Sequence, residues 1–333
     1  MSQPLNLKAR ARRAAERVLR AQARPVRRLL LATGRDRAPR LPEIVQIEST
    51  NICNAKCVFC PRDEMARKQG VMDMALFRKV VDECAELGIE HVRMHNYGEP
   101  FVDRALVEKV RYAKARGIPQ VGMISNGSLI TEAAARGMIE AGLDAINISV
   151  DASGKEVFER TRVGLKYDKV IANVERLLAL RHEAGKRRPK LILSFVRQGN
   201  SADEQAFIEH WRRRADKIHV TDLHNWAGTL NQQSNVTYPC YRPWLTFTAL
   251  WDGRVSLCCA DFDGRTILGD LRTATIREIW NSEPYRAVRR AHLDHGGPEI
   301  CQSCDLPGPA PDAPWCSPRS CSAGRRARAW RRR

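Results

Sequence analysis

The sequence predicts an α/β fold, a partial (β/α)6 TIM-like barrel, because short apolar segments alternate with segments of helical periodicity. The apolar segments are rich in β-branched residues, as expected for buried parallel strands. The expected strands are residues 43–50, 91–98, 120–126, 144–151, 190–196 and 217–223. In a barrel of this kind the catalytic groups gather at the C-terminal ends of the strands.

Helical periodicity fills the intervals between these strands. The expected helices are residues 74–87, 105–116, 131–141, 167–184 and 202–216. Four glycines stand where such helices should end: Gly88, Gly117, Gly142 and Gly185. Each of the first five strands is thus followed by a helix, and the sixth by the cysteine-rich C-terminal region. This order favours parallel strand–helix units.

Changes of composition divide the chain into four regions. Residues 1–40 predict a basic helical N-terminal arm, and residues 41–224 hold the expected barrel. Residues 225–310 predict a small cysteine-rich domain, and residues 311–333 a basic flexible tail.

The formal net charge of +18 is concentrated at the two ends of the chain. Residues 1–40 carry a net charge of +10 and residues 319–333 one of +7, so residues 41–318 carry only about +1. A nearly neutral body argues against a nucleic-acid-binding domain, which normally presents a basic face. We expect the basic ends to be solvated or to dock on an acidic surface.

The cysteine content and the lack of a long apolar run indicate the environment of the protein. The longest apolar run near the start, residues 29–32, is too short for a signal peptide or a membrane span. We therefore expect a cytoplasmic protein without a membrane span. In a reducing compartment, the 11 cysteines point to metal binding or catalysis more than to disulfides.

Three cysteines with the spacing Cys-x3-Cys-x2-Cys follow the first expected strand: Cys53, Cys57 and Cys60. A [4Fe–4S] cluster normally takes four thiolates, so three leave one iron open, as in a catalytic metal site. The competing interpretation is a structural zinc knuckle. Zinc requires four ligands, however, and no fourth cysteine or histidine lies close by in the sequence.

This motif and its place after the first strand resemble the radical S-adenosylmethionine (SAM) superfamily over roughly residues 43–224. The resemblance implies that the open iron chelates SAM and that SAM is cleaved to a 5′-deoxyadenosyl radical, which abstracts hydrogen from a substrate. It also implies SAM contacts at the ends of the second to fourth strands and shortly beyond. The implied residues are Tyr97, Gly98, Glu99, Pro100, Ser125, Asn126, Ser149, Asp151 and Arg162. By the same resemblance, residues 97–100 meet the SAM amino group and Arg162 its carboxylate.

A second set of cysteines comprises Cys240, Cys258, Cys301 and Cys304. Their surroundings resemble the SPASM or twitch extension of radical SAM enzymes, which implies an auxiliary [4Fe–4S] cluster with four thiolates. The competing interpretation is a zinc ribbon with the same ligands. A second auxiliary cluster is not expected, because Ala310 stands where the longer SPASM pattern has a cysteine. Cys316 and Cys321 follow late, with a different spacing.

Residues 238–261 predict a hairpin that turns at Asp252 and Gly253, and residues 276–292 predict one short helix. Adjacent residues of a strand point to opposite faces, so Cys259 would lie near the cluster without binding it. Two interpretations are open for this candidate catalytic thiol. Either Cys259 donates a hydrogen atom to a substrate radical, or it is a small buried hydrophobe.

Other polar residues at strand ends each admit two interpretations. His95 and Asn96 either bind substrate inside the barrel or are satisfied inward-facing polar groups. Residues 222–226 either contact a hydroxyl-rich ligand at the barrel mouth or form a solvated loop. Asp261 and Asp263 either reach a substrate hydroxyl or cap the hairpin turn.

Three functions are compatible with these patterns. The first is a radical SAM oxidoreductase or isomerase that dehydrogenates or epimerises a small polar molecule of the sugar, aminocyclitol or nucleoside type. Its partners would be that substrate and an external electron donor such as flavodoxin or ferredoxin. The second is a peptide maturase, which residues 1–40 disfavour because they are too short for a peptide-recognition domain. The third is a non-catalytic iron–sulfur or zinc protein that binds nucleic acid, which the neutral body disfavours.

Overall fold

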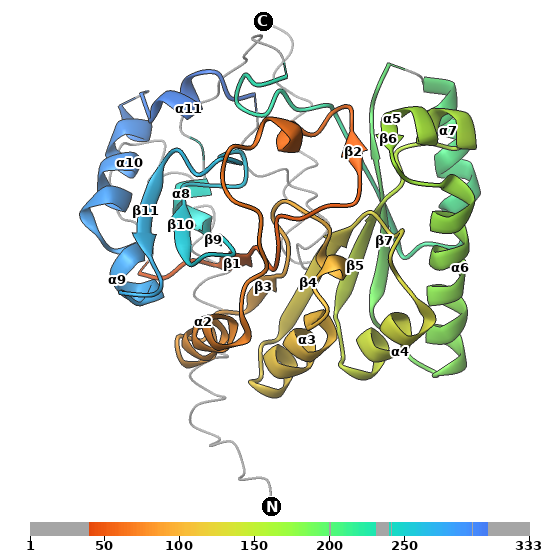
Figure 1. Cartoon of the computed structure of the whole chain (residues 1–333), viewed down its shortest axis with the longest axis horizontal. Helices are drawn as coiled ribbons and strands as arrows, with labels where there is room; N and C mark the ends of the chain where they lie inside the picture. Colours follow the sequence, from red (N-terminus) through yellow and green to blue (C-terminus); the bar gives the residue numbers. More distant parts are fainter. Residues whose placement is uncertain (1–39, 200, 231–239, 241, 295, 306–333) are drawn as a thin grey trace, which may run out of the picture.

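The computed structural model describes residues 40–199, 201–230, 240, 242–294 and 296–305. Within these residues one nine-stranded sheet has the order β11-β10-β9-β1-β3-β4-β5-β7-β8. Every neighbouring pair from β9 to β8 is parallel, and β10 runs antiparallel to both β9 and β11. Figure 1 shows helices α3, α4 and α6 along the outer side of the parallel strands. The expected α/β partial barrel is confirmed.

Every predicted strand and helix of the barrel is present, with ends that differ from the prediction by up to five residues. The strands are β1 (Ile44–Ile47), β3 (His91–Arg93), β4 (Gln120–Ser125), β5 (Ala145–Ser149), β7 (Lys190–Val196) and β8 (Lys217–Thr221). The helices are α2 (Met74–Glu86), α3 (Leu106–Ala115), α4 (Glu132–Glu140), α6 (Tyr167–Glu183) and α7 (Ser201–Trp211). The glycine expected to end α2, Gly88, has a φ of 70°, the left-handed conformation typical of that position. One further helix, α5 (Lys155–Thr161), has no counterpart in the prediction.

Strand β3 ends at Arg93, five residues earlier than predicted, because the chain then turns toward the loop after β1. Gly98 has a φ of 83°, and a Cβ at this position would lie 2.5 Å from the carbonyl oxygen of Thr50. The Glu99 amide donates to the Ile52 carbonyl across the same contact, at 2.8 Å. Only glycine permits this approach, which brings residues 97–100 against the first cysteine loop.

The two faces of the sheet differ in polarity. Alternate strand residues such as Val45, Val92 and Ile146 are fully buried in one apolar core with residues of the outer helices. The residues between them point to the opposite, inner face. Many of these are polar: Gln46, Arg93, Asn147, Ser149, Ser194 and Thr248. The strands are therefore apolar on the face toward the helices, and the barrel has a polar interior.

The cysteine-rich region continues the barrel sheet. Its strands are β9 (Thr246–Ala249), β10 (Arg254–Ser256) and β11 (Ile267–Asp270), and β9 pairs in parallel with β1. Three short helices, α8 (Arg242–Leu245), α9 (Ile276–Trp280) and α11 (Glu299–Gln302), and the longer α10 (Glu283–Leu293) surround these strands. Phe247 of β9 packs on Trp280 and Tyr285, with ring centroids 6.5 and 6.2 Å away. This packing fixes α9 and α10 on β9, and the pairing of β9 with β1 joins the C-terminal region to the barrel.

Two local predictions for this region are wrong. The hairpin begins at Thr246, and its second strand ends at Ser256, because a turn places Cys258 and Cys259 in the following loop. The single helix predicted for residues 276–292 is two helices, α9 and α10. Ser282 is extended between them, with a ψ of 163°, and Pro284 in the first turn of α10 has no amide proton to continue α9.

The predicted N-terminal arm, the basic tail, Cys316 and Cys321 lie outside the described residues. Among the helices that the structure describes, none has the length and apolar character needed to cross a membrane.

Candidate active site

The first three cysteines lie together on the loop after β1. Strand β2 (Lys56–Cys57) pairs with β6 (Arg162–Val163) and holds the middle of this loop in place. The thiols of Cys53, Cys57 and Cys60 are partly buried, and burial raises the pKa of each, to about 11 for Cys60. The neighbouring thiols Cys57 and Cys53 also raise the pKa of Cys60, as negative charges close to one another must.

The surroundings of these thiols fit an iron–sulfur cluster better than a single metal ion. Arg62 and Arg162 lower the pKa values of the thiols and so favour the thiolate forms. Four zinc ligands would have to meet at one ion, whereas each thiolate of a cube binds a different iron.

Glu99 joins the ends of β3 and β4 beside the first cysteine set. Its carboxylate accepts hydrogen bonds from the Ser125 hydroxyl (2.8 Å), the Asn126 amide (2.6 Å) and the Phe101 amide (3.1 Å). Burial raises the pKa of Glu99, and these three hydrogen bonds counteract that effect. Pro100 starts the short helix η2 (Pro100–Val102), which turns the chain away from the site.

Asn126 connects this group directly to the cysteine loop. Its side-chain amide nitrogen donates to Asn54 Oδ1 at 2.9 Å and lies 3.9 Å from the Cys53 sulfur. Ser149, at the end of β5, lies next to Ser194 of β7, with their hydroxyls 3.3 Å apart. The structure thus brings Glu99, Ser125 and Asn126 to the cysteines.

Asp151 and Arg162, two further predicted SAM contacts, pair with each other. Asp151 is fully buried, and its carboxylate accepts from the Arg162 guanidinium and from the Val196 amide (2.9 Å). The other arm of Arg162 donates to the Cys57 sulfur at 3.6 Å. Both side chains are therefore committed to the wall of the cysteine loop in this structure.

Tyr97 lies between the two cysteine sets. Its hydroxyl donates to the Cys259 carbonyl at 2.6 Å, and burial raises its pKa well above the usual range. Its ring contacts Trp226, with centroids 5.8 Å apart. The Trp226 indole nitrogen donates to the Phe59 carbonyl of the first cysteine loop at 2.8 Å. Tyr97 and Trp226 therefore link the two sites, a role that their sequence positions did not reveal.

The second cysteine set also comes together. Cys258 is buried, and burial, followed by the charges of Cys259, Cys240 and Cys301, raises its pKa. Burial raises the pKa of Cys301 to about 12, and Cys240 and Cys304 add to the effect. Each of the four residues thus acts electrostatically on at least one other member of the set or is acted on by one, as is expected of ligands of one cluster.

Cys259 occupies a position that differs from its predicted one. It follows β10 in a turn, where the Ala260 amide donates to the Cys258 sulfur (3.4 Å) and the Asp261 amide to the Cys258 carbonyl (3.2 Å). The strand alternation expected to separate Cys258 from Cys259 does not apply in this turn. The Cys259 thiol is partly exposed and acts on the pKa of Cys258.

A buried ion pair that the sequence did not single out holds the site together. Arg67 binds the Glu48 carboxylate through both guanidinium arms, at 2.5 and 2.6 Å. Arg67 Nε also donates to the Phe262 carbonyl (2.6 Å), and the Trp251 amide donates to Glu48 (3.2 Å). The pair therefore ties the end of β1 to the loop after the first cysteines and to the C-terminal region.

Asp261 and Asp263 act mainly on the backbone. Asp261 accepts from the amides of Arg265 and Thr266, at 2.7 and 2.9 Å, and so caps the turn after Cys259. Asp263 accepts from the amides of Ala66 and Arg67. Both sets of hydrogen bonds favour the interpretation that these carboxylates cap turns over the one in which they bind a substrate hydroxyl.

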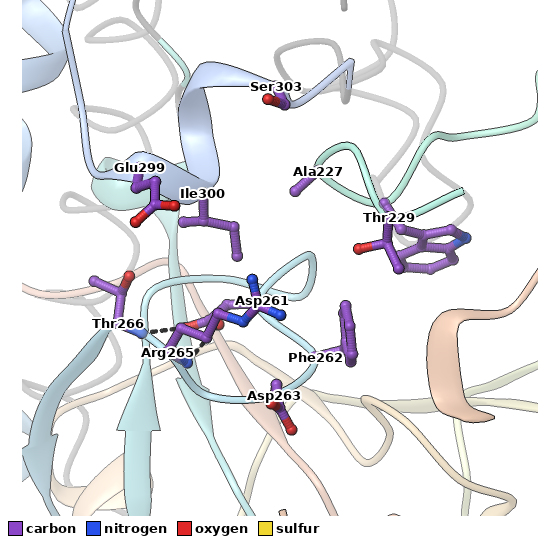
Figure 2. A pocket seen from close by; sticks show the side chains of 11 residues that line it. Ala227, Thr229, Asp261, Phe262, Asp263, Arg265, Thr266, Glu299, Ile300 and Ser303 are labelled. Atoms are coloured by element: carbon purple, nitrogen blue, oxygen red, sulfur yellow. Dashed lines mark hydrogen bonds between the residues drawn. The ribbon is translucent and has the colours of Figure 1, made fainter. Parts of the chain in front are cut away.

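A cavity of about 190 Å³ lies beside the second cysteine set. Figure 2 shows its three walls: Glu299 and Ile300 from α11, Arg265 from the turn after Cys259, and Thr229 from the segment after β8. Asn225, at the start of that segment, donates to the Ser303 carbonyl and binds Asp305. Asn225 is thereby tied to the residues that carry Cys301 and Cys304, whereas Asp222 and Leu223 of the same segment are exposed.

Comparisons with known proteins agree with this architecture. The sequence profile of the radical SAM superfamily matches residues 47–187, and that of the SPASM iron–sulfur cluster-binding domain matches residues 240–305. The chain belongs to the radical SAM superfamily and carries a C-terminal SPASM domain. Its cofactors are the [4Fe–4S] cluster and SAM of that superfamily and a SPASM auxiliary cluster.

The chain is similar to curated enzymes with two kinds of activity. It is 30% identical over 189 residues to GTP 3′,8-cyclase of Chlorobaculum tepidum, and the matched region covers 56% of each chain. The chain thus spans about half the length of that relative. It is 23% identical over 275 residues to the SAM-dependent 2-deoxy-scyllo-inosamine dehydrogenase of Niallia circulans, covering 80% of this chain and 94% of the relative.

Solved structures share the fold. The crystal structure of BtrN in complex with AdoMet and 2-DOIA superimposes with a TM-score of 0.58 at 19% identity, covering 80% of this chain and 94% of that one. Streptococcus suis SuiB bound to precursor peptide SuiA gives a TM-score of 0.66 at 11% identity, covering 85% and 75%.

Proposed function

We propose that this radical SAM enzyme removes a hydrogen atom from a hydroxyl-bearing carbon of a polar small molecule and dehydrogenates it. When bound, SAM and its cluster supply a 5′-deoxyadenosyl radical, and the auxiliary cluster supplies a one-electron acceptor. The candidate ligands are Cys53, Cys57 and Cys60 for the first cluster and Cys240, Cys258, Cys301 and Cys304 for the auxiliary one. Glu99, Ser125, Asn126 and Ser149 are candidates to orient SAM.

The polar inner face of the barrel is the observation that carries this proposal. Two of its side chains bury a polar atom for which the described residues offer no hydrogen-bond partner: Asn147 Oδ1 and Thr248 Oγ1, in residues that are 2% and 0% exposed. Leaving such groups unpaired costs about 1–3 kcal/mol each, which a ligand with several hydroxyls would relieve. The similarity to 2-deoxy-scyllo-inosamine dehydrogenase, which extends over most of both chains, supports the same substrate class.

His95 follows β3 near this inner face and is suited to a neutral role. Burial, and secondarily the charge of Arg93, lowers the pKa of His95 to about 3. At neutral pH the imidazole is therefore uncharged and can both donate and accept a hydrogen bond. An uncharged imidazole that can donate and accept suits a hydroxyl group, which is itself uncharged and can do both.

Epimerisation through Cys259 is the second candidate. The observation that favours it is a partly exposed thiol next to the second cysteine set and outside the proposed ligands. In this reaction Cys259 returns a hydrogen atom to the substrate radical, and the product keeps the oxidation state of the substrate. The thiyl radical left on Cys259 takes one electron from the external reductant and one proton, which restores the thiol.

The test begins with protein reconstituted anaerobically, which should bind about eight iron atoms and release 5′-deoxyadenosine from SAM under reduction. Aminocyclitols, nucleotides including GTP, and peptides are then offered in deuterated water. An oxidised product without solvent deuterium supports dehydrogenation. Incorporation of one deuterium, lost in a Cys259→Ala variant, supports epimerisation. A product from peptides alone would refute the proposed substrate class, and a GTP product at the oxidation level of GTP would refute dehydrogenation.

A further inference from the structure

Arg162 is a buried cation built into the wall of the first cysteine loop. Its side chain is only 7% exposed, and its guanidinium lies 5.4 Å from the centre of the Phe59 ring. One arm of the guanidinium donates to the Cys57 sulfur at 3.6 Å and the other binds Asp151. A positive charge is thereby placed against one of the three thiols.

The backbone fixes this position. Arg162 and Cys57 face each other in the β2–β6 pairing, and the Val58 amide donates to the Thr161 carbonyl at 3.0 Å. Gly164 lies close to the opposite part of the cysteine loop, where a Cβ would come within 3.3 Å of the Asn54 carbonyl oxygen. The contact between Arg162 and the cysteine loop is therefore set by the strand register and does not depend on a flexible side chain alone.

Asp151 holds the guanidinium from the other side. It is fully buried and has a φ of 60°, a left-handed conformation that costs a non-glycine residue about 1 kcal/mol or more. Its second carboxylate oxygen accepts from the Val196 amide. Strain of this kind is typical of residues that position a functional group.

The guanidinium keeps its charge in this setting. A guanidinium is not deprotonated in proteins, and that of Arg162 is hydrogen-bonded to the buried Asp151 carboxylate. A fixed positive charge and an N–H donor at a cluster sulfur are two of the factors that set the reduction potential of an iron–sulfur cluster.

We propose that Arg162, positioned by Asp151, raises the reduction potential of the cluster at Cys53, Cys57 and Cys60, beyond any contact with SAM. The reduced cluster carries one more negative charge, so a nearby cation stabilises it relative to the oxidised form. One electron enters from an external reductant, and Arg162 stays protonated throughout. The inference rests on the proposed ligands of the first cluster and is independent of the substrate.

The test is a redox titration of the reconstituted full-length protein without SAM, followed by electron paramagnetic resonance. The signal that changes on later addition of SAM identifies the first cluster. For Arg162→Gln we expect a lower midpoint potential than for the wild type at equal iron content. Arg162→Lys keeps the charge but cannot make both contacts at once, so it should shift the potential in the same direction by a smaller amount.

Arg160→Gln is the matched control. It removes the same charge two residues before Arg162, at a side chain that is 64% exposed. We expect it to leave the potential unchanged. An unchanged potential in Arg162→Gln, together with at least tenfold weaker SAM binding, would show that Arg162 serves SAM alone and would overturn the proposal. If Arg162→Gln does not bind iron, an unchanged potential in Arg162→Lys overturns it as well. Failure of the wild type to bind the first cluster would instead refute the ligand assignment.

Discussion

Single residues in the barrel interior carry the evidence for the substrate class. Strand alternation turns Asn147 toward the inner face, where the carbonyl oxygen of its side chain has no hydrogen-bond partner among the residues that the structure describes. A folded protein retains an unpaired buried group mainly where function requires it, because the group costs stability. Asn173 offers a contrast, since its amide donates to the Gly127 carbonyl at 2.8 Å and to the Ser128 carbonyl at 3.3 Å.

Asn147→Leu should therefore stabilise the protein and weaken substrate binding. Leucine has a similar size and removes the unpaired oxygen, so we expect the free energy of unfolding to rise by about 1 kcal/mol. The KM for the hydroxylated substrate should rise about tenfold, equivalent to about 1.4 kcal/mol. Urea unfolding and steady-state kinetics measure the two effects.

Asn173→Leu is the matched control for this substitution. It leaves two backbone carbonyls without their partner and should destabilise the protein by about 1–3 kcal/mol. If Asn147→Leu destabilises to the same extent, the Asn147 amide is structural and the argument from its unpaired oxygen fails.

At the scale of elements, the loop between β2 and α2 is held by a buried ion pair. Arg67 and Glu48 have side chains that are 4% and 0% exposed, and together they connect β1 to the carbonyl of Phe262. Cys57 and Cys60 of the first cysteine set lie at the start of this loop, and the second set lies on the C-terminal side of the connection. The spacing between the two sites therefore depends on this pair as well as on Tyr97 and Trp226.

Arg67→Met should destabilise the protein strongly, because it leaves the Glu48 carboxylate buried without its cation. Such a loss typically costs about 3–5 kcal/mol. The double variant Glu48→Gln/Arg67→Met should recover part of this loss, as thermal unfolding of the reconstituted protein can measure. Arg136→Met breaks an exposed helical pair with Glu132 and should change the stability by less than about 0.5 kcal/mol. Equal effects of Arg67→Met and Arg136→Met would show that the buried pair has no special role.

At the scale of the whole molecule, buried histidines make the stability depend on pH. Burial lowers the pKa of His95 to about 3 and that of His292 to about 4. The unfolded chain binds a proton at each histidine near pH 6.5, whereas the folded protein does so only at lower pH. The stability that these groups confer is therefore present above about pH 6.5 and is lost as the pH falls toward 4.

His95→Gln should reduce the loss of stability on acidification. Between pH 6 and pH 4, removal of one buried neutral histidine flattens the dependence by up to about 1.4 kcal/mol per pH unit. Urea unfolding at several pH values measures the slope for the wild type and the variant. His210→Gln, at an exposed position of α7, serves as the surface control. Parallel curves for His95→Gln and the wild type would contradict the neutral, buried state of His95.

The sequence by itself determined the order of strands and helices, because hydrophobic periodicity and glycines at helix ends are local properties. It also determined the two cysteine sets, since their spacing belongs to the chain, and their resemblance to radical SAM and SPASM proteins. Only the tertiary structure decided that β9 pairs with β1, that Arg162 contacts Cys57, and that Glu48 binds Arg67. These contacts join residues far apart in the chain, and no local pattern encodes which distant partner a buried polar group will meet. The turn at Cys258 and Cys259 belongs to the same class, because the carboxylate of Asp261 and the packing around it, not strand propensity, set its conformation.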